Sequence, residues 1–429
     1  MVSLVHRPSG VGTHEHPQRA GSQFVTSMRH LIIVGAGPVG VVAALDALRR
    51  GYRVTLIEAD AEIDTNPRAA TFHPSTLEMV ARLGFFDEFV AAGLVARHFD
   101  FWDKPTLSLT ARMDHQILED DTPHPYVVQC EQHKLVEMGL ARLATVADAE
   151  VHRGVAVTDV TQANDRAVVH ADGPDGPLRF EGDFVIGCDG GRSTVRKAID
   201  VEFEGFTWPE RFVVLTSLYD MQQVLGCSFR NYFADPDEWV NLFKVAGEDG
   251  QPRWRTVFPT GVEQDDDEAL SDEECARRLT SVAPSAGVDD LIHRKTYNVH
   301  QRVAAQFRVG RVFLAGDAAH VNNPIGGLGL NCGIHDAVEL LDTLDDHPTT
   351  GELDEGLLDR YGRRRRPLIV EFVQKQTIAN KKRLEVTDEA EREEKRRELA
   401  ETAEDPQRHR EFLLRSSLIA SVRASKEID

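Results

Sequence analysis

Long apolar runs are missing from this sequence of 429 residues. No stretch approaches the roughly 20 consecutive apolar residues that a membrane-spanning helix needs, and the N-terminus has no apolar signal-peptide core. We therefore expect no stable membrane insertion and no export, and we predict a cytoplasmic protein. Residues 1–28 are rich in Gly, His, Pro and Ser, which predicts a flexible extension ending at a second candidate start codon, Met28.

Cysteine and positive charge are also scarce. The five cysteines are odd in number, lie far apart and never form a Cys-x-x-Cys pair, which argues against a disulfide framework and a zinc site, so we expect no metal. Asp and Glu outnumber Lys and Arg by 70 to 49, for a net charge of -21. That charge repels phosphates, so we expect no nucleic-acid partner. The arginine run at residues 363–366 is accordingly predicted to be a solvated helix face.

What the sequence does contain begins with a βαβ pattern at residues 29–58, which predicts a parallel sheet. Short strands separated by turns at residues 151–187 predict added antiparallel strands. β-Branched and aromatic runs from Phe206 to about Pro259 predict a separate antiparallel sheet, the natural substrate platform. An apolar strand at residues 311–316 resumes the first sheet, and the chain after about Gly356 has a helical composition. We predict a mixed α/β fold.

The turn of the βαβ unit carries a Gly-x-Gly-x-x-Gly pattern. Gly35 permits the tight turn, Gly37 lets the backbone approach a pyrophosphate, and Gly40 permits close packing of the helix on the strand. The start of the following helix attracts negative phosphates. Glu58 ends the second strand, where it can accept hydrogen bonds from a ribose. The pattern predicts a dinucleotide site of the Rossmann type but does not identify the dinucleotide.

Two further motifs follow along the chain. Residues 188–196 read Cys-Asp-Gly-Gly-Arg-Ser-Thr-Val-Arg, and residues 310–320 read Gly-Arg-Val-Phe-Leu-Ala-Gly-Asp-Ala-Ala-His, followed by Pro-Ile-Gly-Gly-Leu-Gly-Leu-Asn at 324–331. Together with the glycine turn, and in this order, they resemble the motifs of the para-hydroxybenzoate hydroxylase-like (class A) flavoprotein monooxygenases.

The resemblance implies FAD as the cofactor, NAD(P)H and O2 as co-substrates, and hydroxylation of an aromatic ring through a C4a-hydroperoxyflavin. The substrate is expected to be a small phenolic, polyketide or nitrogen-heteroaromatic compound. A non-oxygenating flavin reductase of the same fold and a non-catalytic flavin-binding protein are the alternatives, while the lack of a Trp-x-Trp-x-Ile-Pro motif disfavours a halogenase. We expect a monomer or a homodimer.

The resemblance also implies which residues hold the cofactor. Asp317 would accept hydrogen bonds from ribityl or ribose hydroxyls, and a helix starting near Asn331 would direct its positive end toward reduced flavin. Arg192 and Arg196 fit a pyrophosphate and ordinary helix capping equally well. The predicted cofactor-binding residues are Gly35, Gly37, Pro38, Gly40, Glu58, Arg68, Gln129, Asp189, Gly190, Gly316, Asp317, Gly326, Gly327, Leu328, Gly329, Leu330 and Asn331.

Three residues are candidates for the chemistry. His73 and Tyr232 could act as a base or proton relay for a phenolic substrate, although a structural histidine is an equal reading of His73. Pro324 would fix the loop that approaches the flavin ring. A closed apolar cavity should shield the reaction from water. Its candidate aromatic lining residues are Phe72, Tyr232, Phe233, Trp239, Phe243 and Trp254.

The motifs and the strand pattern suggest a division of the chain into domains. We expect an FAD-binding domain at residues 29–97, 126–205 and 296–356, a substrate domain at 98–125 and 206–295, and a helical C-terminal region at 357–429. Residues 207–212 (Thr-Trp-Pro-Glu-Arg-Phe) resemble the start of the substrate domain in hydroxylases of phenols and polyketides. The chain should be a short form that ends in helices.

Overall fold

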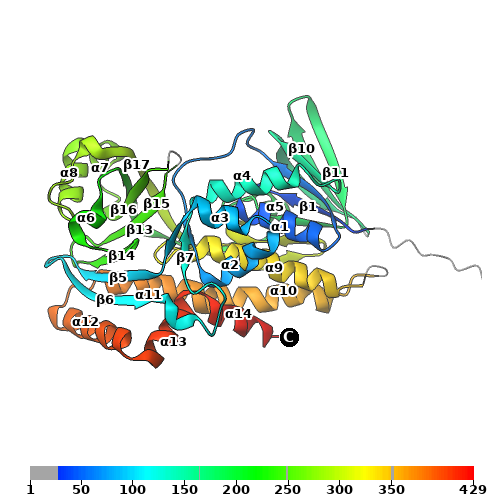
Figure 1. Ribbon diagram of the computed structural model, residues 1–429. Coiled ribbons are helices and arrows are strands. Elements are labelled where there is room, and N and C mark those ends of the chain that lie inside the picture. The colour runs from blue at the N-terminus through cyan, green and yellow to red at the C-terminus, as the bar shows by residue number, and fades with distance from the viewer. Residues whose placement is uncertain (1–27, 164, 248–249, 349–351) are drawn as a thin grey trace, which may run out of the picture.

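A computed structural model describes residues 28–163, 165–247, 250–348 and 352–429 (Figure 1). The extension expected at residues 1–28 lies outside the described residues, apart from Met28. The fold is mixed α/β, as the sequence predicts, with two main sheets and a series of C-terminal helices along one side of both.

The first main sheet has six strands in the order β18-β19-β12-β1-β2-β8. The strands are β1 (His30–Val34), β2 (Arg53–Glu58), β8 (Ala149–Arg153), β12 (Phe184–Gly187), β18 (Arg308–Val309) and β19 (Val312–Leu314). All neighbours pair in parallel except β18 and β19. Strand β1 is buried along its whole length because both faces of the sheet are covered, and this explains the apolar run that follows His30.

Helices and a small sheet cover the two faces. Helix α1 (Pro38–Arg49) packs against α4 (Gln132–Leu143) and α9 (Leu328–Asp346). The three-stranded sheet of β9 (Ala156–Gln162), β10 (Ala167–Gly173) and β11 (Gly176–Gly182) contacts strands of the six-stranded sheet. A second small sheet joins β3 (Thr71–Phe72), β7 (Val127–Gln129) and β4 (Leu94–Ala96), next to α2 (Pro74–Val80) and α3 (Phe86–Ala92).

The second main sheet has eight strands in the order β20-β17-β13-β16-β15-β14-β5-β6. They are β5 (His98–Asp103), β6 (Ser108–Asp114), β13 (Phe203–Ser217), β14 (Arg230–Ala234), β15 (Val240–Ala246), β16 (Pro252–Gly261), β17 (Leu291–Ala304) and β20 (His320–Val321). One face packs on α7 (Asp266–Ala269) and α8 (Asp272–Thr280). The other face packs on the C-terminal helices. Strand β20 begins at His320, the last residue of the motif at residues 310–320, which we call the second flavin motif. One edge of this sheet therefore lies beside the dinucleotide motifs.

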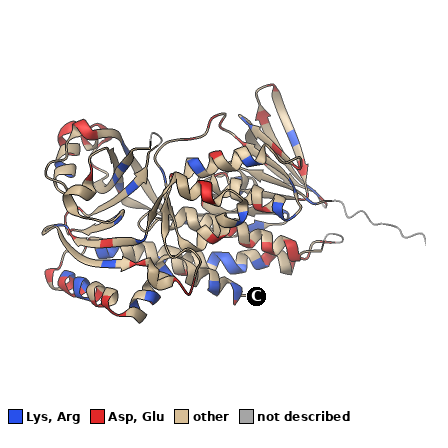
Figure 2. Cartoon of the chain, in the orientation of Figure 1, with Lys and Arg blue, Asp and Glu red and all other residues tan. Residues whose placement is uncertain are grey.

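The C-terminal helices run beneath both sheets in the view of Figure 1. They are α10 (Glu355–Leu368), a π-helical turn (Ile369–Gln374), α11 (Lys375–Leu384), α12 (Glu389–Glu404), α13 (Pro406–Ser416) and α14 (Ile419–Lys426). The π-turn follows Pro367, which has no N–H to continue the regular ladder. Acidic and basic side chains are mixed along α12 (Figure 2), and most of them are exposed.

The prediction of a solvated arginine run at residues 363–366 is wrong for its third member. Arg365 is 1% exposed, and its Nε donates a hydrogen bond to Asp336 Oδ1 at 2.7 Å. Arg364 pairs with Glu339 at 2.8 Å. Arg364 and Arg365 thus lie in the contact between α10 and α9 and help to hold these two helices together. No helix in the described part of the chain has the length and apolar character needed to cross a membrane.

Candidate active site

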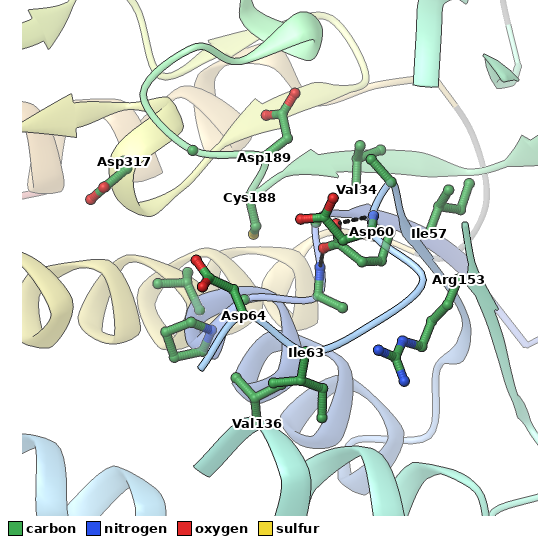
Figure 3. Close-up of a pocket in the computed structure, with 18 of the residues that line it drawn as sticks. Val34, Ile57, Asp60, Ile63, Asp64, Val136, Arg153, Cys188, Asp189 and Asp317 are labelled. Carbon is green, nitrogen blue, oxygen red and sulfur yellow. Dashed lines mark hydrogen bonds between the residues drawn. The ribbon is translucent and has the colours of Figure 1, made fainter. Parts of the chain in front are cut away.

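A cavity of about 630 Å³ opens at the C-terminal ends of β1, β2 and β12 (Figure 3). This is the edge at which open parallel sheets bind ligands. Asp189 and Asp317 enter it from neighbouring loops, and Asp64 lies on the segment that follows β2. The predicted cofactor residues that line it are Gly35, Gly37, Pro38, Glu58, Arg68, Asp189, Gly190, Asp317 and Leu330.

Each of the three glycines in the first turn is required there for a different structural reason. Gly35 has φ +101°, and a Cβ there would lie 2.5 Å from the carbonyl oxygen of Cys188. A Cβ on Gly40 would lie 1.8 Å from the carbonyl oxygen of Gly35. A Cβ on Gly37 would meet nothing within 4 Å, because this position faces the open cavity at the start of α1. The backbone is thus exposed to a ligand where a pyrophosphate would lie, which fits FAD.

Glu58 braces the same turn from the end of β2. Its Oε2 accepts a hydrogen bond from the Ala36 N–H at 2.6 Å, and its Oε1 accepts one from the Asp60 N–H at 2.9 Å. An ionised carboxylate has further lone pairs. Since Glu58 lines the cavity, these lone pairs remain available to ribose hydroxyls.

The motif at residues 188–196, which we call the Asp-Gly motif, is held in place by the side chain of its aspartate, Asp189. Asp189 Oδ2 accepts from the Thr194 N–H at 2.7 Å, and its Oδ1 accepts from Ser193 Oγ at 2.6 Å. The carboxylate therefore shapes the turn before α5 (Thr194–Ala198). Gly190 has φ +77° and no atom near the place of a Cβ, so its backbone faces the cavity.

The two arginines of this motif have separate environments. Arg196 is 5% exposed and donates to the carbonyls of Ala318 at 2.8 Å and Gly191 at 2.9 Å. Its guanidinium also lies 3.8 Å from the ring centre of Phe203. Arg196 thus connects the Asp-Gly motif to the second flavin motif through hydrogen bonds to both. Arg192 is exposed and lines the cavity, which leaves it as the cation of the pair that can meet a phosphate.

Asp317 points into the cavity from the turn after β19 (Figure 3). Its side chain is exposed to the cavity. Its carboxylate has no hydrogen-bond partner among the described residues, and desolvation by the surrounding protein raises its pKa. An unpartnered acceptor facing a cavity fits the hydroxyl-rich chain of FAD.

The turn that carries Asp317 rests on a buried charge network that the sequence analysis missed. Asp336 Oδ2 accepts from the Gly316 N–H at 3.1 Å and lies 2.7 Å from His320 Nε2. Its other oxygen accepts from Arg365. Burial alone would raise the pKa of Asp336, but the charges of His320 and Arg365 lower it. The available signal was an aspartate in an otherwise apolar stretch of α9, which needs a buried partner.

Residues 324–331, which we call the second flavin loop, turn tightly into α9. Gly326 has φ +108° and Gly327 has φ +68°, and the helix begins at Leu328, three residues before the predicted start near Asn331. Asn331 instead acts as a buried clamp. Its Nδ2 donates to the carbonyls of Gly327 at 2.6 Å and Thr71 at 2.8 Å.

His73 supports this loop from the opposite side. Its Nε2 lies 2.9 Å from the carbonyl oxygen of Gly326 and must donate, and its backbone N–H donates to Asn331 Oδ1 at 2.9 Å. Burial, with a contribution from the charge of Arg230, holds the pKa of His73 well below its usual value. The ring is therefore neutral, and its Nδ1 is a buried acceptor that has no partner among the residues that the structure describes. His73 is not among the residues lining either described cavity.

Gln129 and Arg68 complete the set of predicted contacts from the first half of the chain. Gln129 is 0% exposed, its Oε1 accepts from Thr71 Oγ1 at 2.7 Å, and its Nε2 has no partner in the part of the chain that the structure describes. Gln129 lines neither cavity, so its contact with the cofactor stays a prediction. Arg68 lies at the cavity and pairs with Asp64 at 2.7 Å, with its side chain 59% exposed.

A second cavity, of about 30 Å³, lies between the flavin loop, strands β5 and β14, and helices α11 and α13. Of the six aromatic residues predicted to line a substrate cavity, Tyr232 does so. Phe233 and Trp254 belong to the core on the opposite face of the sheet. Phe72 packs in the main core against Phe89.

The remaining aromatic walls were missed. They are Phe99, Phe101 and Phe412. Their signal in β5 was the alternation of two phenylalanines at i and i+2, which places both on one face of a strand. Pro324 lies outside both cavities; its carbonyl accepts from the Gly327 N–H at 2.9 Å, so it helps to close the loop.

Comparison with known proteins agrees with this geometry. A family model described as an FAD binding domain matches residues 29–376. The chain is 32% identical over 391 residues to a para-nitrophenol 4-monooxygenase of Pseudomonas sp. (strain WBC-3), covering 90% of this chain and 94% of the relative. It is 33% identical over 363 residues to a 6-hydroxy-3-succinoylpyridine 3-monooxygenase of Pseudomonas putida (strain DSM 28022 / S16), covering 83% and 89%. The crystal structure of a p-nitrophenol 4-monooxygenase from Pseudomonas putida DLL-E4 matches with a TM-score of 0.84 and 30% identity, covering 92% of this chain and 98% of that one.

Proposed function

Because the chain belongs to the family of FAD-dependent aromatic monooxygenases, we propose that it hydroxylates a phenol or a hydroxylated nitrogen heteroaromatic, using NAD(P)H and O2. Two relatives, each covered over more than four fifths of its length, are named as monooxygenases of a phenol and of a hydroxypyridine. Operation in the cytoplasm, as a monomer or a homodimer, stays a prediction.

The observation that carries the proposal is the position of the second cavity. Ile325, Gly326 and Leu328 of the second flavin loop form one wall, and aromatic rings from β5, β14 and α13 form the others. A small aromatic compound in this place would lie between the loop and the aromatic walls. This cavity, at about 30 Å³, is too small for an aromatic ring. Side chains such as Phe412 on α13 must therefore move to admit a substrate.

The residues of the first cavity would hold the cofactor. The chemistry that FAD supplies when bound is reduction by NAD(P)H, activation of O2 and transfer of one oxygen atom to the ring. We expect the backbone at Gly37 and Gly190, which borders the cavity, to approach the pyrophosphate, Glu58 to bind a ribose, and Asp317 to accept hydrogen bonds from hydroxyls. In the balanced reaction one atom of O2 enters the ring, the other leaves as water, and NAD(P)H provides two electrons.

The chain also offers groups for proton movement and shielding. Tyr232 Oη accepts a hydrogen bond from Arg230 Nη2 at 3.0 Å, which leaves its own proton free for a substrate hydroxyl. His73 holds the carbonyl of Gly326 and thereby positions the loop beside the cavity. The aromatic side chains exclude water, which would otherwise intercept the reactive oxygen.

The proposal is tested by measuring NAD(P)H oxidation and product formation by the purified yellow holoprotein across a panel of phenols and hydroxypyridines. We expect at least one compound to accelerate NAD(P)H oxidation and to yield a product heavier by one oxygen atom. NAD(P)H oxidation coupled to reduction of a panel member, with no oxygenated product, would identify a reductase instead.

A further inference from the structure

A third cavity, of about 30 Å³, lies beside the second one. Its walls come from β5, β6 and β14 on one side and from α11 and α12 on the other. Three residues, Phe101, Arg383 and Leu384, line both cavities and so form the partition between them. A ring in the third cavity would have to pass only this partition to reach the second flavin loop.

Two of the three residues in the partition are fixed. Phe101 is buried, and its ring is stacked on that of Tyr232 with 5.5 Å between the ring centres. Leu384 is also buried, and its carbonyl accepts a hydrogen bond from the Asp235 N–H at 2.9 Å. Arg383 is therefore the member of the partition that can move.

Arg383 has few ties to its place in the partition. Its guanidinium carbon lies 5.9 Å from the ring centres of both Phe101 and Phe412, and it makes no hydrogen bond or ion pair within the described residues. A change of rotamer would therefore break no hydrogen bond. Desolvation lowers the pKa of Arg383, while the charge of Glu398 on α12 opposes this shift. Rotation toward α12 would return the guanidinium to water and bring it closer to Glu398.

Helix α12 covers the third cavity and packs along β6, the edge strand of the second main sheet (Figure 1). Leu399 is the one buried residue of this fully described helix. Elements with so few buried apolar contacts open locally while the rest of the fold stays intact. Helix α12 can therefore act as a lid.

Ion pairs with one carboxylate hold this lid closed. Asp103 on β5 is 2% exposed, and its Oδ1 lies 3.0 Å from Arg392 Nη2 and 3.6 Å from Arg396 Nη1. Both arginines also line the third cavity. Separation of these two pairs would release the side of α12 that faces the cavity.

The wall of the second cavity between α11 and α13 is more firmly tied. Asn380 Nδ2 donates to the carbonyl of Ile325 at 3.3 Å, and Gln376 Nε2 donates to Asn380 Oδ1 at 2.8 Å. Movement there would break a hydrogen bond to the second flavin loop, whereas rotation of Arg383 breaks none. The route past Arg383 is therefore the easier one.

We propose that Arg383 is the gate through which the aromatic substrate enters the second cavity. The substrate arrives beneath α12 when the Asp103 ion pairs open, and the side chain of Arg383 then rotates out of the partition to admit it. Closure behind the substrate restores the shield against water that the reaction needs. This inference rests on the proposed hydroxylase function and adds the route by which its substrate reaches the flavin loop.

The test measures the rate constants for entry and exit of para-nitrophenol, by stopped-flow absorbance with the oxidised holoprotein and no NAD(P)H. A lid that opens more readily should raise both rate constants alike, because the change favours neither the free nor the bound protein. The double variant Arg392→Gln, Arg396→Gln should raise both about 3- to 10-fold, the range for losing two part-exposed ion pairs. The dissociation constant, which is their ratio, should stay unchanged.

Arg383→Ala should raise the association rate constant. A residue that only contacts the bound ligand changes mainly the dissociation rate constant, so faster association identifies a gate. Arg397→Gln is the matched control for the lid, because Arg397 lies on α12 with its side chain 64% exposed. It should leave both rate constants unchanged.

Hydrogen–deuterium exchange measures the opening of α12 without a ligand. The backbone amides of residues 389–404 should exchange faster in the double variant than in Arg397→Gln, while those of β5 keep their rates. Equal exchange of residues 389–404 in the two proteins would overturn the proposal, whether or not para-nitrophenol binds. Faster exchange throughout the double variant would do the same, because it would show general destabilisation.

Unchanged association in both Arg383→Ala and the double variant would also overturn the proposal and would place the entry elsewhere, such as between α11 and α13. The fate of the proposed function is read separately from the products. Gated binding of para-nitrophenol without any oxygenated product would refute hydroxylation and leave the gate in place. Hydroxylation with no effect of these variants on entry would do the reverse.

Discussion

Arg365 Nε lies 2.7 Å from Asp336 Oδ1, and both side chains are almost completely buried beneath the turn that presents Asp317 to the cavity. The same aspartate accepts from the Gly316 N–H through its other oxygen. One carboxylate on α9 thus connects a C-terminal helix, α10, to the second flavin motif. The position of Asp317 depends on residues that never touch the cavity.

Replacing Asp336 with Asn should destabilise the protein by about 3–5 kcal/mol, because it leaves Arg365 buried without its counter-charge. The free energy of unfolding in urea measures this. Arg365→Met in the same background should recover part of the loss, and additive effects of the two substitutions would contradict the coupling. The pKa of Asp336 is lowered in the folded state, so its contribution is present above its unfolded pKa of about 4. It should be lost as the pH falls through the folded value, and the Asn variant should lack that loss.

Gly37→Val should yield a folded protein that does not retain FAD. The backbone of Gly37 has φ -67°, which any residue adopts, and a Cβ there would meet only open cavity, where the pyrophosphate must approach. Flavin absorbance per polypeptide and circular dichroism measure the two effects. Gly40→Ala is the contrasting variant, because its Cβ would collide with the Gly35 carbonyl, and it should lose stability. A fully yellow Gly37→Val protein would contradict the pyrophosphate assignment.

Asp317→Ala should weaken FAD binding by roughly 10- to 150-fold, the equivalent of the 1.5–3 kcal/mol of hydrogen bonds to a charged group. The dissociation constant of the reconstituted apoprotein measures this. Desolvation by the surrounding protein raises the pKa of Asp317, and its ionised form offers hydroxyls more acceptor sites than its protonated form. FAD affinity of the unsubstituted protein should therefore fall on acidification at a higher pH than for an ordinary aspartate. Asp342→Ala, on the exposed face of α9, should change neither property, and a pH profile shared by Asp317→Ala would exclude this role.

His73→Ala should lower hydroxylation while FAD remains bound, because the Gly326 carbonyl loses its hydrogen-bond donor. A displaced loop would admit water, so a smaller fraction of the NAD(P)H consumed should appear as hydroxylated product. His73→Gln retains an N–H donor and should recover part of this coupling. If both variants match the unsubstituted protein in turnover and coupling, His73 has no part in the mechanism.

The dinucleotide turn could be predicted from the sequence because its reasons are local. Gly35, Gly37 and Gly40 lie within six residues. Their spacing alone indicates a tight turn, an approach of the backbone to a pyrophosphate, and close packing of the helix on the strand. The order of the three motifs also predicted the mixed α/β fold and the FAD site. Helix α9, which follows the second flavin motif, begins earlier than the sequence predicts. Gly327, with its left-handed backbone, is the N-cap, so the helix starts at Leu328.

The second cavity could not be predicted in this way, because its walls meet only through long-range pairing. Strand β14 pairs in parallel with β5, which places Tyr232 opposite Phe101 across about 130 residues of chain. No local pattern specifies that register. Arg230 was missed for the same reason. Its surroundings form only where β5, β14 and the second flavin loop pack together, and no local sequence pattern shows which residues meet there. Arg365 was assigned to solvent because its partner, Asp336, lies on another helix.

The most direct test of the account is the fate of labelled oxygen when the holoprotein turns over a phenol with NAD(P)H under ¹⁸O2. The account predicts one labelled atom in the ring hydroxyl added, with NAD(P)H consumed in step with product. Product without label, or NAD(P)H oxidation that never gives a hydroxylated ring with any phenol or hydroxypyridine tested, would contradict it.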